Sequence, residues 1–304
     1  MHDQRLKDIV PFVTSVEKGS FTAAAEHLHV TGSAVSKSVS RLEARLGSRL
    51  LERTTRHLQL TDAGHAYYQT CMRILEELSE AESVLAAQRT IPSGRLRLAV
   101  PNTYGRLAVM PLLMPFCQQH PEIELSLTFS DRFIDLFDEG IDVAVRIGGS
   151  VDLPASLGCR LSGREKMVFC ASPDYLAREG CPRTVEELMQ HRAILYERVD
   201  GSTKPWLFTT ADGHQNWRNV PYRMALGDVD AQVQAVVAGL GVAQMPTWLV
   251  RMPLLRGELQ VIMPELQPDG LALSLVWPRR KQWLPKVDAL LNVLSQLEIA
   301  GPFS

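Results

Sequence analysis

Residues 20–43, SFTAAAEHLHVTGSAVSKSVSRLE, hold the clearest structural signal in this chain. The hydroxyl of Ser20 can accept hydrogen bonds from the free first-turn amides of a helix, so a helix is predicted from Thr22 to Leu28. The segment Thr31–Ser33 contains a glycine and forms a short turn, after which a second helix runs from about Ser33 to Leu46. Two helices joined in this way form a helix-turn-helix, whose second helix presents its N-terminal residues to the DNA major groove.

The second of these helices has two contrasting faces. Its apolar residues predict one buried stripe, closed by Gly47, and they are Val35, Val39, Leu42 and Leu46. The other face carries hydroxyls and cations, which suit phosphates and base edges. These residues are Ser33, Ser36, Lys37, Ser40 and Arg41, with Thr31 in the preceding turn. Ser36 and Lys37 are the predicted base contacts, and the alternative is a basic helix face that only meets solvent.

A helix from Leu6 to Val16 precedes this motif, and a basic hairpin follows it. Leu50–Leu51 and Leu58–Leu60 are predicted as short strands on either side of Glu52–His57. The hairpin tip is expected to reach phosphates or the minor groove through Arg53, Thr54, Thr55 and Arg56. Between Thr31 and His57, six Lys and Arg residues stand against two Glu, whereas the whole chain carries −2. A basic segment on an acidic remainder suits an anionic partner for that segment alone.

The next predicted element is a long helix from Asp62 to about Arg89. Every third or fourth residue along it is apolar, in a heptad pattern made by Tyr67, Cys71, Ile74, Leu78, Ala81 and Leu85. This pattern favours pairing with a second copy of the same helix, and the alternative is packing on its own domain. The segment Thr90–Gly94 contains Pro, Ser and Gly and is predicted to be a linker.

After the linker, strands and helices alternate, which predicts two α/β lobes, mostly parallel sheets and a cleft between the lobes. The expected strands are 95–100, 123–129, 142–147, 166–171, 223–226, 242–245, 259–263 and 271–277. The expected helices are one from the loop 101–105 to about 119, followed by 133–139, 174–178, 185–191, 230–238 and 285–297.

The composition of the 304 residues, 45% hydrophobic and 22% charged, is that of an ordinary soluble globular protein. There is no signal-peptide pattern and no apolar run of membrane-span length, and the five cysteines form no CxxC pair, so a cytoplasmic protein with reduced thiols is expected. The sequence has no GxSxG motif and no metal-ligand spacing, so neither enzymatic activity, nor a cofactor, nor a metal site is expected. A solute-binding protein would need export, and an α/β enzyme would need a catalytic constellation; both remain as unfavoured alternatives.

Four stretches resemble the LysR-type transcriptional regulators closely: SFTAAAEHL (20–28), GSAVSKSVSRLE (32–43), LGSRLLERTTR (46–56) and LTDAG (60–64). The resemblance continues more thinly through DVAVRIG (142–148), GLGVAQMP (239–246) and the terminal helix after Pro285. It therefore extends over essentially the whole chain, with its specific motifs in the first 64 residues.

The resemblance implies a multidomain α/β protein that binds operator DNA as a homodimer or homotetramer and responds to a small molecule. It implies a winged helix-turn-helix at 1–61 (helix-turn-helix about 20–43) and a dimerising linker helix at 62–90. The remainder, 91–304, would be an effector-binding domain like periplasmic binding proteins. Its lobe I would span about 95–163 and 266–304, and its lobe II about 164–265.

Within the family the effector binds between the lobes, which in this chain implies contacts from Asn102, Thr103, Arg146, Tyr196, Asp228 and Thr247. Independently of the resemblance, Asn102 and Thr103 follow a strand and begin a helix, where free amides favour an anion. Arg146 could clamp a carboxylate through two hydrogen bonds, so a carboxylate is one candidate effector. The alternatives are that Asn102 and Thr103 only cap the helix and that Arg146 pairs with a neighbouring aspartate.

Overall fold

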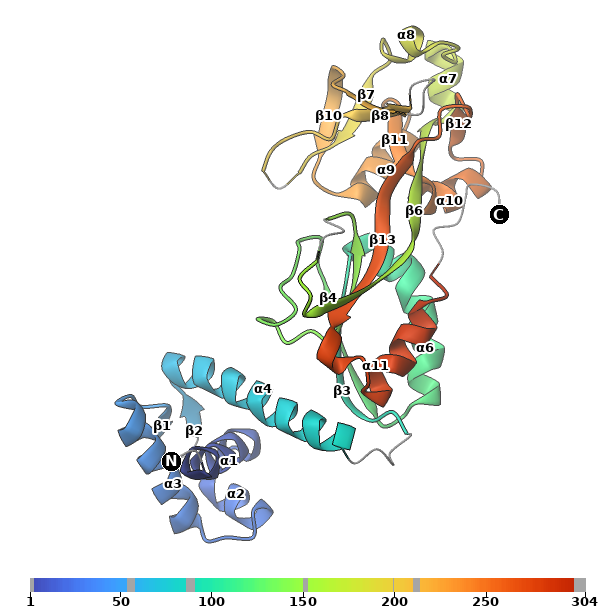
Figure 1. Cartoon of the computed structure of the whole chain (residues 1–304). Helices are drawn as coiled ribbons and strands as arrows, with labels where there is room; N and C mark the ends of the chain where they lie inside the picture. The colour runs from blue at the N-terminus through green and yellow to red at the C-terminus, as the bar shows by residue number, and fades with distance from the viewer. Residues whose placement is uncertain are drawn as a thin grey trace. The chain divides into compact units, whose positions relative to one another are not determined.

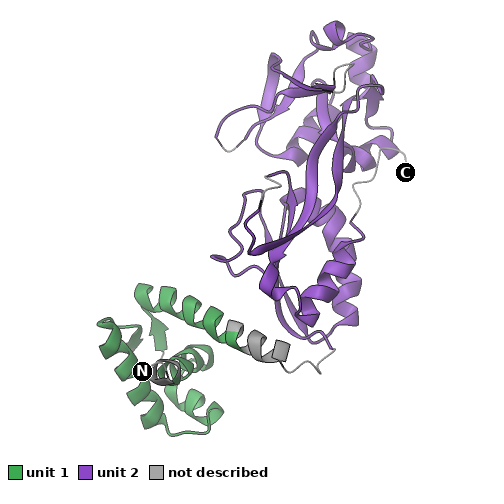
Figure 2. Cartoon of the chain, viewed as in Figure 1, with its two compact units in different colours: residues 1–88 green, residues 89–304 purple. Residues whose placement is uncertain are grey.

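The computed structural model describes residues 3–53, 58–85, 91–149, 153–198, 200–209 and 214–297. The chain divides into two compact units, Met1–Gln88 and Arg89–Ser304, coloured separately in Figure 2. Among the described helices, none is both long and apolar enough to cross a bilayer.

The first unit consists of helices around a short hairpin (Figure 1). Its elements are α1 (Asp3–Lys18), α2 (Phe21–His27), α3 (Gly32–Leu46), β1 (Leu51–Arg53), β2 (Leu58–Leu60) and α4 (Asp62–Leu85). Ser20 Oγ accepts from Ala23 N at 3.0 Å, and Gly47 ends α3 in the left-handed region at φ 65°. The predicted helix-turn-helix and its end signals are confirmed.

Three of the four residues in the predicted apolar stripe of α3 are buried in the core of this unit. Val35, Val39 and Leu42 are buried, whereas Leu46 is 40% exposed. The prediction for Leu46 is therefore wrong. The helix ends directly after it, and Leu50, beyond the Gly47 turn, enters the core instead.

The heptad residues of α4 divide into two groups. Tyr67 and Cys71 pack into the core of their own unit, against α1 and α3 residues such as Phe12 and Val39. Ile74 and Leu78 are 42% and 44% exposed. The side chains of Ala81 and Leu85, and the predicted helix end at Arg89, lie outside the described residues. Packing within its own unit thus explains why the first heptad residues, Tyr67 and Cys71, are apolar, but it does not explain Ile74 and Leu78. We call the row of heptad residues on α4 the seam.

The second unit is organised around two long strands that run from one lobe into the other (Figure 1). β6 (Leu157–Ala171) pairs with β13 (Asp269–Pro278) over its first part. Farther along, β6 pairs with β11 (Ala243–Pro246) and β12 (Gln260–Ile262). All three pairings are antiparallel. Only β4 (Ile123–Phe129) and β5 (Val143–Ile147) lie parallel to β3 (Gly94–Val100), so the expectation of a mostly parallel sheet is wrong for this sheet.

Lobe I, as the structure has it, is the core formed by β3, β4, β5 and the adjoining part of β13 with two helices, α6 (Met110–Gln119) and α11 (Pro285–Leu294). The helix predicted to reach Gln119 is in three pieces, because α5 (Asn102–Tyr104) and a π-helical turn, η1 (Gly105–Val109), precede α6. The predicted helix 133–139 is absent. Asp135 Oδ1 accepts from the backbone amides of Phe137 and Asp138, and this local bonding competes with a helix.

Lobe II holds the remaining elements, with cores around Phe169 and around Val168. They are α7 (Pro173–Glu179), α8 (Val185–Leu188), β7 (Ala193–Tyr196), β8 (Trp206–Thr209), β9 (Gln215–Arg218), β10 (Tyr222–Leu226), α9 (Val229–Val237) and α10 (Thr247–Leu255). β7 and β10 are parallel, and β8 and β9 form an antiparallel hairpin. β7, β8, β9 and α10 were not predicted. A short 3₁₀ turn, η2 (Arg279–Lys281), follows β13.

Candidate nucleic-acid interface and lobe junction

The N-terminal half of α3 offers a polar surface. Thr31 Oγ1 accepts from Ala34 N at 3.3 Å and so caps the helix, and it lies 3.1 Å from Ser33 Oγ. Ser33, Lys37 and Ser40 are exposed and Ser36 is half-buried, opposite the buried stripe of α3. The predicted hydroxyls and the Lys37 ammonium are therefore together on one accessible helix face.

Arg41, on the next turn, has a partner that the sequence did not suggest. Its Nη2 donates to Asp8 Oδ1 at 2.9 Å and to Ser38 Oγ at 2.9 Å. The Arg41 side chain is 57% exposed, whereas that of Asp8 is 6% exposed. Arg41 thus holds α3 against α1 by satisfying a buried carboxylate, whatever else its outward-facing N–H groups contact.

The hairpin is tied to α3 at its base. Glu43 Oε1 accepts from the backbone amides of Leu50 and Leu51, at 2.9 and 3.1 Å. These bonds fix where β1 begins, close to the end of α3. The side chain of Arg53 and the predicted tip residues Thr54, Thr55 and Arg56 lie outside the described residues.

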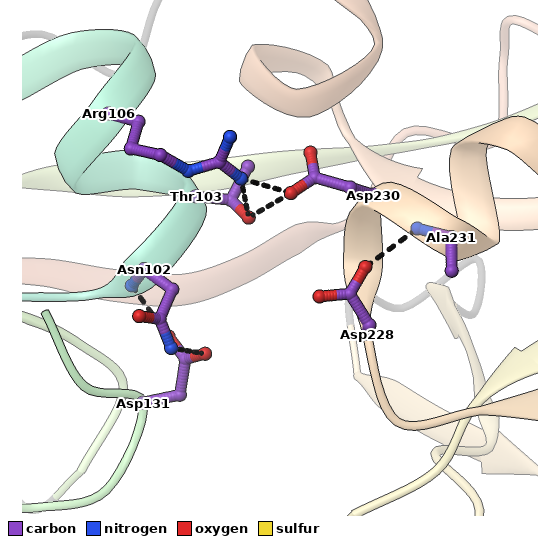
Figure 3. A network of polar contacts seen from close by, with 7 residues as sticks. All are labelled: Asn102, Thr103, Arg106, Asp131, Asp228, Asp230 and Ala231. Atoms are coloured by element: carbon purple, nitrogen blue, oxygen red, sulfur yellow. Dashed lines mark hydrogen bonds and ion pairs between the residues drawn. The ribbon is translucent and has the colours of Figure 1, made fainter.

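Asn102 and Thr103 lie where lobe I meets lobe II, but neither caps a helix. Pro101 occupies the N-cap position of α5, with no side-chain bond. Asn102 donates twice to Asp131, from its backbone N at 2.9 Å and from Nδ2 at 2.6 Å. Thr103 Oγ1 donates to Asp230 Oδ2 at 2.9 Å, across to the first turn of α9 (Figure 3).

Arg106 completes this network. Its Nη2 lies 3.3 Å from Thr103 Oγ1 and pairs with Asp230 Oδ2, so that η1 in lobe I is linked to α9 in lobe II (Figure 3). Asn102 and Thr103, which were expected to receive an anionic effector, therefore already bind protein carboxylates. Arg106, Asp131 and Asp230 were not predicted, because nothing in the local sequence marks them as partners of residues so far away in the chain.

Among the described residues, Arg146 does not hydrogen-bond a neighbouring aspartate, which was its alternative role, and its contact with a carboxylate effector stays a prediction. Its Nη2 donates to the backbone oxygen of Ile134 at 2.7 Å, and its guanidinium lies 5.8 Å from the ring centre of Phe133. Burial lowers the pKa of Arg146, and the nearby Asp135 carboxylate opposes that shift. The charge of Asp135 thus affects the pKa of Arg146, but the guanidinium donates its hydrogen bond to the main chain.

Three further predicted residues lie on lobe II. Tyr196, at the end of β7, is half-buried, and burial raises its pKa, with Asp131 and Asp228 adding to the shift. Asp228 caps α9 by accepting from Ala231 N at 2.7 Å. Thr247 is buried at the start of α10. Tyr196 thus lies close enough to the carboxylates of Asp131 and Asp228 to be affected by their charge, and both of these aspartates are drawn in Figure 3.

In the part of the chain that the structure describes, no group of three or more His, Cys, Asp or Glu side chains could hold a metal ion.

Two family models match the chain. "Bacterial regulatory helix-turn-helix protein, lysR family" matches residues 6–65, and "LysR substrate binding domain" matches residues 89–298. Together they span both compact units.

Curated relatives match over nearly their full length. The chain is 34% identical to a probable HTH-type transcriptional regulator, LtrA, of Klebsiella pneumoniae, over 96% of this chain and 94% of that protein. It is 32% identical to the HTH-type transcriptional activator AaeR of Escherichia coli K12, over 96% and 93%.

Two solved structures also match the chain over nearly its full length. The LysR-type regulator CrgA of Neisseria meningitidis matches with a TM-score of 0.60 and 32% identity, over 95% of this chain and 97% of that one. The full-length virulence activator AphB of Vibrio cholerae matches with a TM-score of 0.60 and 27% identity, over 96% and 99%. With a helix-turn-helix in its first unit and this effector-binding domain in its second, the chain belongs to the LysR family of bacterial transcriptional regulators.

Proposed function

We propose that this regulator reads its operator through α3, with Ser36 and Lys37 contacting bases and the neighbouring hydroxyls contacting phosphates. The observation that carries the proposal is the polar, accessible face of α3, with its hydroxyls and the Lys37 ammonium opposite a buried apolar stripe. Short hydroxyl side chains let the helix backbone approach the groove, and a lysine can reach a guanine edge. Arg53, Thr54, Thr55 and Arg56 are the proposed backbone contacts beside it.

The proposed DNA-binding form contains two copies of the chain, or four as a pair of such dimers. Ile74 and Leu78 support this, because they continue an apolar seam on α4 beyond the part that packs into its own unit. Two helix-turn-helix units related by a two-fold axis place their second helices about one DNA turn apart. The operator is therefore expected to be roughly palindromic.

The effector is proposed to act by favouring one arrangement of the two lobes. The lobes are joined by long strands and by polar side-chain contacts such as that of Thr103 with Asp230, which can form or break at small cost. A ligand shifts such an equilibrium only if it binds one arrangement better than the other. Footprints of the protein on its operator, with and without saturating effector, should then differ in extent or in DNA bending.

Retention on immobilised duplex DNA as a function of salt tests the central claim. The logarithm of the binding constant should fall by about 0.9 per phosphate contact for each tenfold rise in salt. Fragments selected from genomic DNA should share a palindromic sequence. A salt-independent profile, or selected fragments without a common sequence, would contradict operator binding.

A further inference from the structure

Leu50, which lies between the end of α3 and the first residue of β1, is bonded to both α3 and the start of α4. Its backbone amide donates to Glu43 Oε1 at 2.9 Å, and the amide of Leu51 donates to the same oxygen at 3.1 Å. Its backbone oxygen accepts from Thr61 N, directly before α4, at 3.0 Å. A continuous path of hydrogen bonds therefore leads from α3 through Leu50 to α4. We call Glu43, Leu50 and Thr61, with the hydrogen bonds they form, the α3–α4 joint.

The hydroxyl of Thr61 adds two further bonds to the α3–α4 joint. Thr61 Oγ1 donates to the backbone oxygen of Arg49 at 2.8 Å, and it accepts from Gly64 N, in the first turn of α4, at 2.9 Å. The same hydroxyl thus caps α4 and holds that end of the helix against the segment that leaves α3.

Gly64 lets the first turn of α4 come into direct contact with the main chain of Leu50. A Cβ at position 64 would overlap the backbone oxygen of Leu50, which is the oxygen that accepts from Thr61. Gly64 and Leu50 are both buried. Because main chain packs here on main chain, the start of α4 has little room to tilt relative to Leu50.

Glu43 is a charged acceptor beside a buried core. Leu50 and Leu51 are buried together with Leu42 of α3 and Cys71 of α4. A hydrogen bond from an amide to a carboxylate is about twice as strong as one between neutral groups. Removing the Glu43 carboxylate would leave both amides without this acceptor, which costs more than the bonds themselves contribute.

We propose that Glu43 and Thr61 are positioning residues for operator binding, which fix the angle between α3 and α4 and thereby the spacing of the half-sites that a dimer contacts. The inference rests on the proposed function, in which α3 enters the major groove and α4 pairs with a second copy. In such a dimer the angle at the α3–α4 joint sets the separation of the two α3 helices. A stiff joint makes binding sensitive to operator length, whereas a loose joint lets each α3 follow a displaced half-site.

One base pair added between the half-sites changes both their separation and their relative orientation. Because a helical turn of DNA spans about 10 base pairs, each added pair moves one half-site by about 3.4 Å and rotates it by roughly 35°. The α3–α4 joint cannot follow such a displacement without breaking its bonds. The parent protein should therefore lose about tenfold or more in affinity, as it would for a mismatched base pair.

Competition binding of the full-length protein to two duplexes tests the inference. One duplex is the palindrome selected from genomic DNA, and the other is the same palindrome with one base pair inserted at its centre. The measured quantity is the ratio of the two affinities. In Glu43→Ala and Thr61→Val this ratio should fall from about tenfold to about threefold, half the parent's value on a logarithmic scale. Glu43→Gln keeps the accepting oxygen and should retain most of the parent's ratio.

Glu17→Ala and Thr70→Val are the matched controls, and both should keep the parent's ratio. Glu17 is exposed near the end of α1, and Thr70 is exposed on α4, where its Oγ1 donates to Ala66 O. A residue that only stabilises the fold would weaken binding to both duplexes equally, so an unchanged ratio in Glu43→Ala and Thr61→Val overturns the inference. If Glu43→Ala does not fold, Thr61→Val decides, because valine keeps the shape of the threonine side chain.

The parent protein separates this inference from the proposed function. If the parent does not prefer the palindrome to a duplex of scrambled sequence, the proposed function fails. If the parent prefers the palindrome but binds the lengthened duplex equally well, only the inference about the α3–α4 joint is refuted.

Discussion

Lys37 and Arg41 are one helical turn apart on α3, but their surroundings give them different tasks. Lys37 is exposed near the N-terminal end of the helix, where a recognition helix contacts base edges. Arg41 bonds the nearly buried carboxylate of Asp8 on α1. The positive charge of Arg41 therefore serves helix packing, whereas that of Lys37 is available for the proposed DNA contact, and each residue makes its own prediction.

Lys37→Ala is expected to weaken operator binding by about 1–3 kcal/mol and to relax sequence preference at one operator position, as loss of a base contact does. Lys18→Ala is the matched control, because Lys18 is an exposed lysine at the end of α1. Competition binding against a set of single-base operator variants measures both effects. Uniform weakening on all sequences would instead assign Lys37 to a phosphate. Arg56→Ala is expected to give that uniform result.

Arg41→Ala is expected to lower the free energy of unfolding of the first unit, since Asp8 would be left buried without its cation. Arg41 is 57% exposed, so solvent screens the pair and the loss should be only about 1 kcal/mol. Urea denaturation measures it. Replacing Asp8 as well, as Asp8→Ala, should make the double variant more stable than the sum of the single losses predicts. Strict additivity would show that the two side chains do not stabilise one another.

At the scale of elements, the sequence predicts those helices whose ends are marked by capping residues. Ser20 and Gly47 mark the boundaries around α2 and α3, and the structure has both. The first part of β6 was missed, because residues 157–165 contain glycines, cations and exposed positions and lack an apolar alternation. α10 was missed because Pro253 lies inside it, and a proline argues against a helix unless packing compensates.

The exposed seam residues of α4 carry a prediction about assembly. Ile74→Asp and Leu78→Asp are each expected to shift the protein toward the monomer and to weaken operator binding, since a charge would enter the helix–helix contact. Light scattering measures the mass. Gln69→Asp is the control, because Gln69 is exposed on α4 and lies outside the heptad positions. If both seam variants keep the parent's mass, α4 does not pair through this face.

At the scale of the whole chain, contacts between distant segments limit what the sequence can show. Asn102 and Thr103 were predicted to lie at the lobe junction, and they do, but Asp131 is 29 residues from Asn102 and Asp230 is 127 residues from Thr103. No periodicity or motif joins such pairs. Asn102 and Asp131 meet because β3 and β4 pair side by side, whereas Thr103 and Asp230 meet because β6 and β13 connect the lobes. Both pairings are themselves non-local.

The junction network gives the last prediction, which concerns local opening between the lobes. Asp230→Ala removes the partner of Thr103 and Arg106, and should speed amide hydrogen exchange in α5 and η1 by up to about fivefold, the effect of an exposed ion pair of roughly 1 kcal/mol. Asp228→Ala removes only the cap of α9, so its faster exchange should stay within α9. If α5 and η1 exchange at the parent's rate in both variants, Asp230 does not hold the lobes together. If Asp228→Ala also speeds exchange in α5, the first turn of α9 as a whole, and not the Asp230 carboxylate, supports the junction.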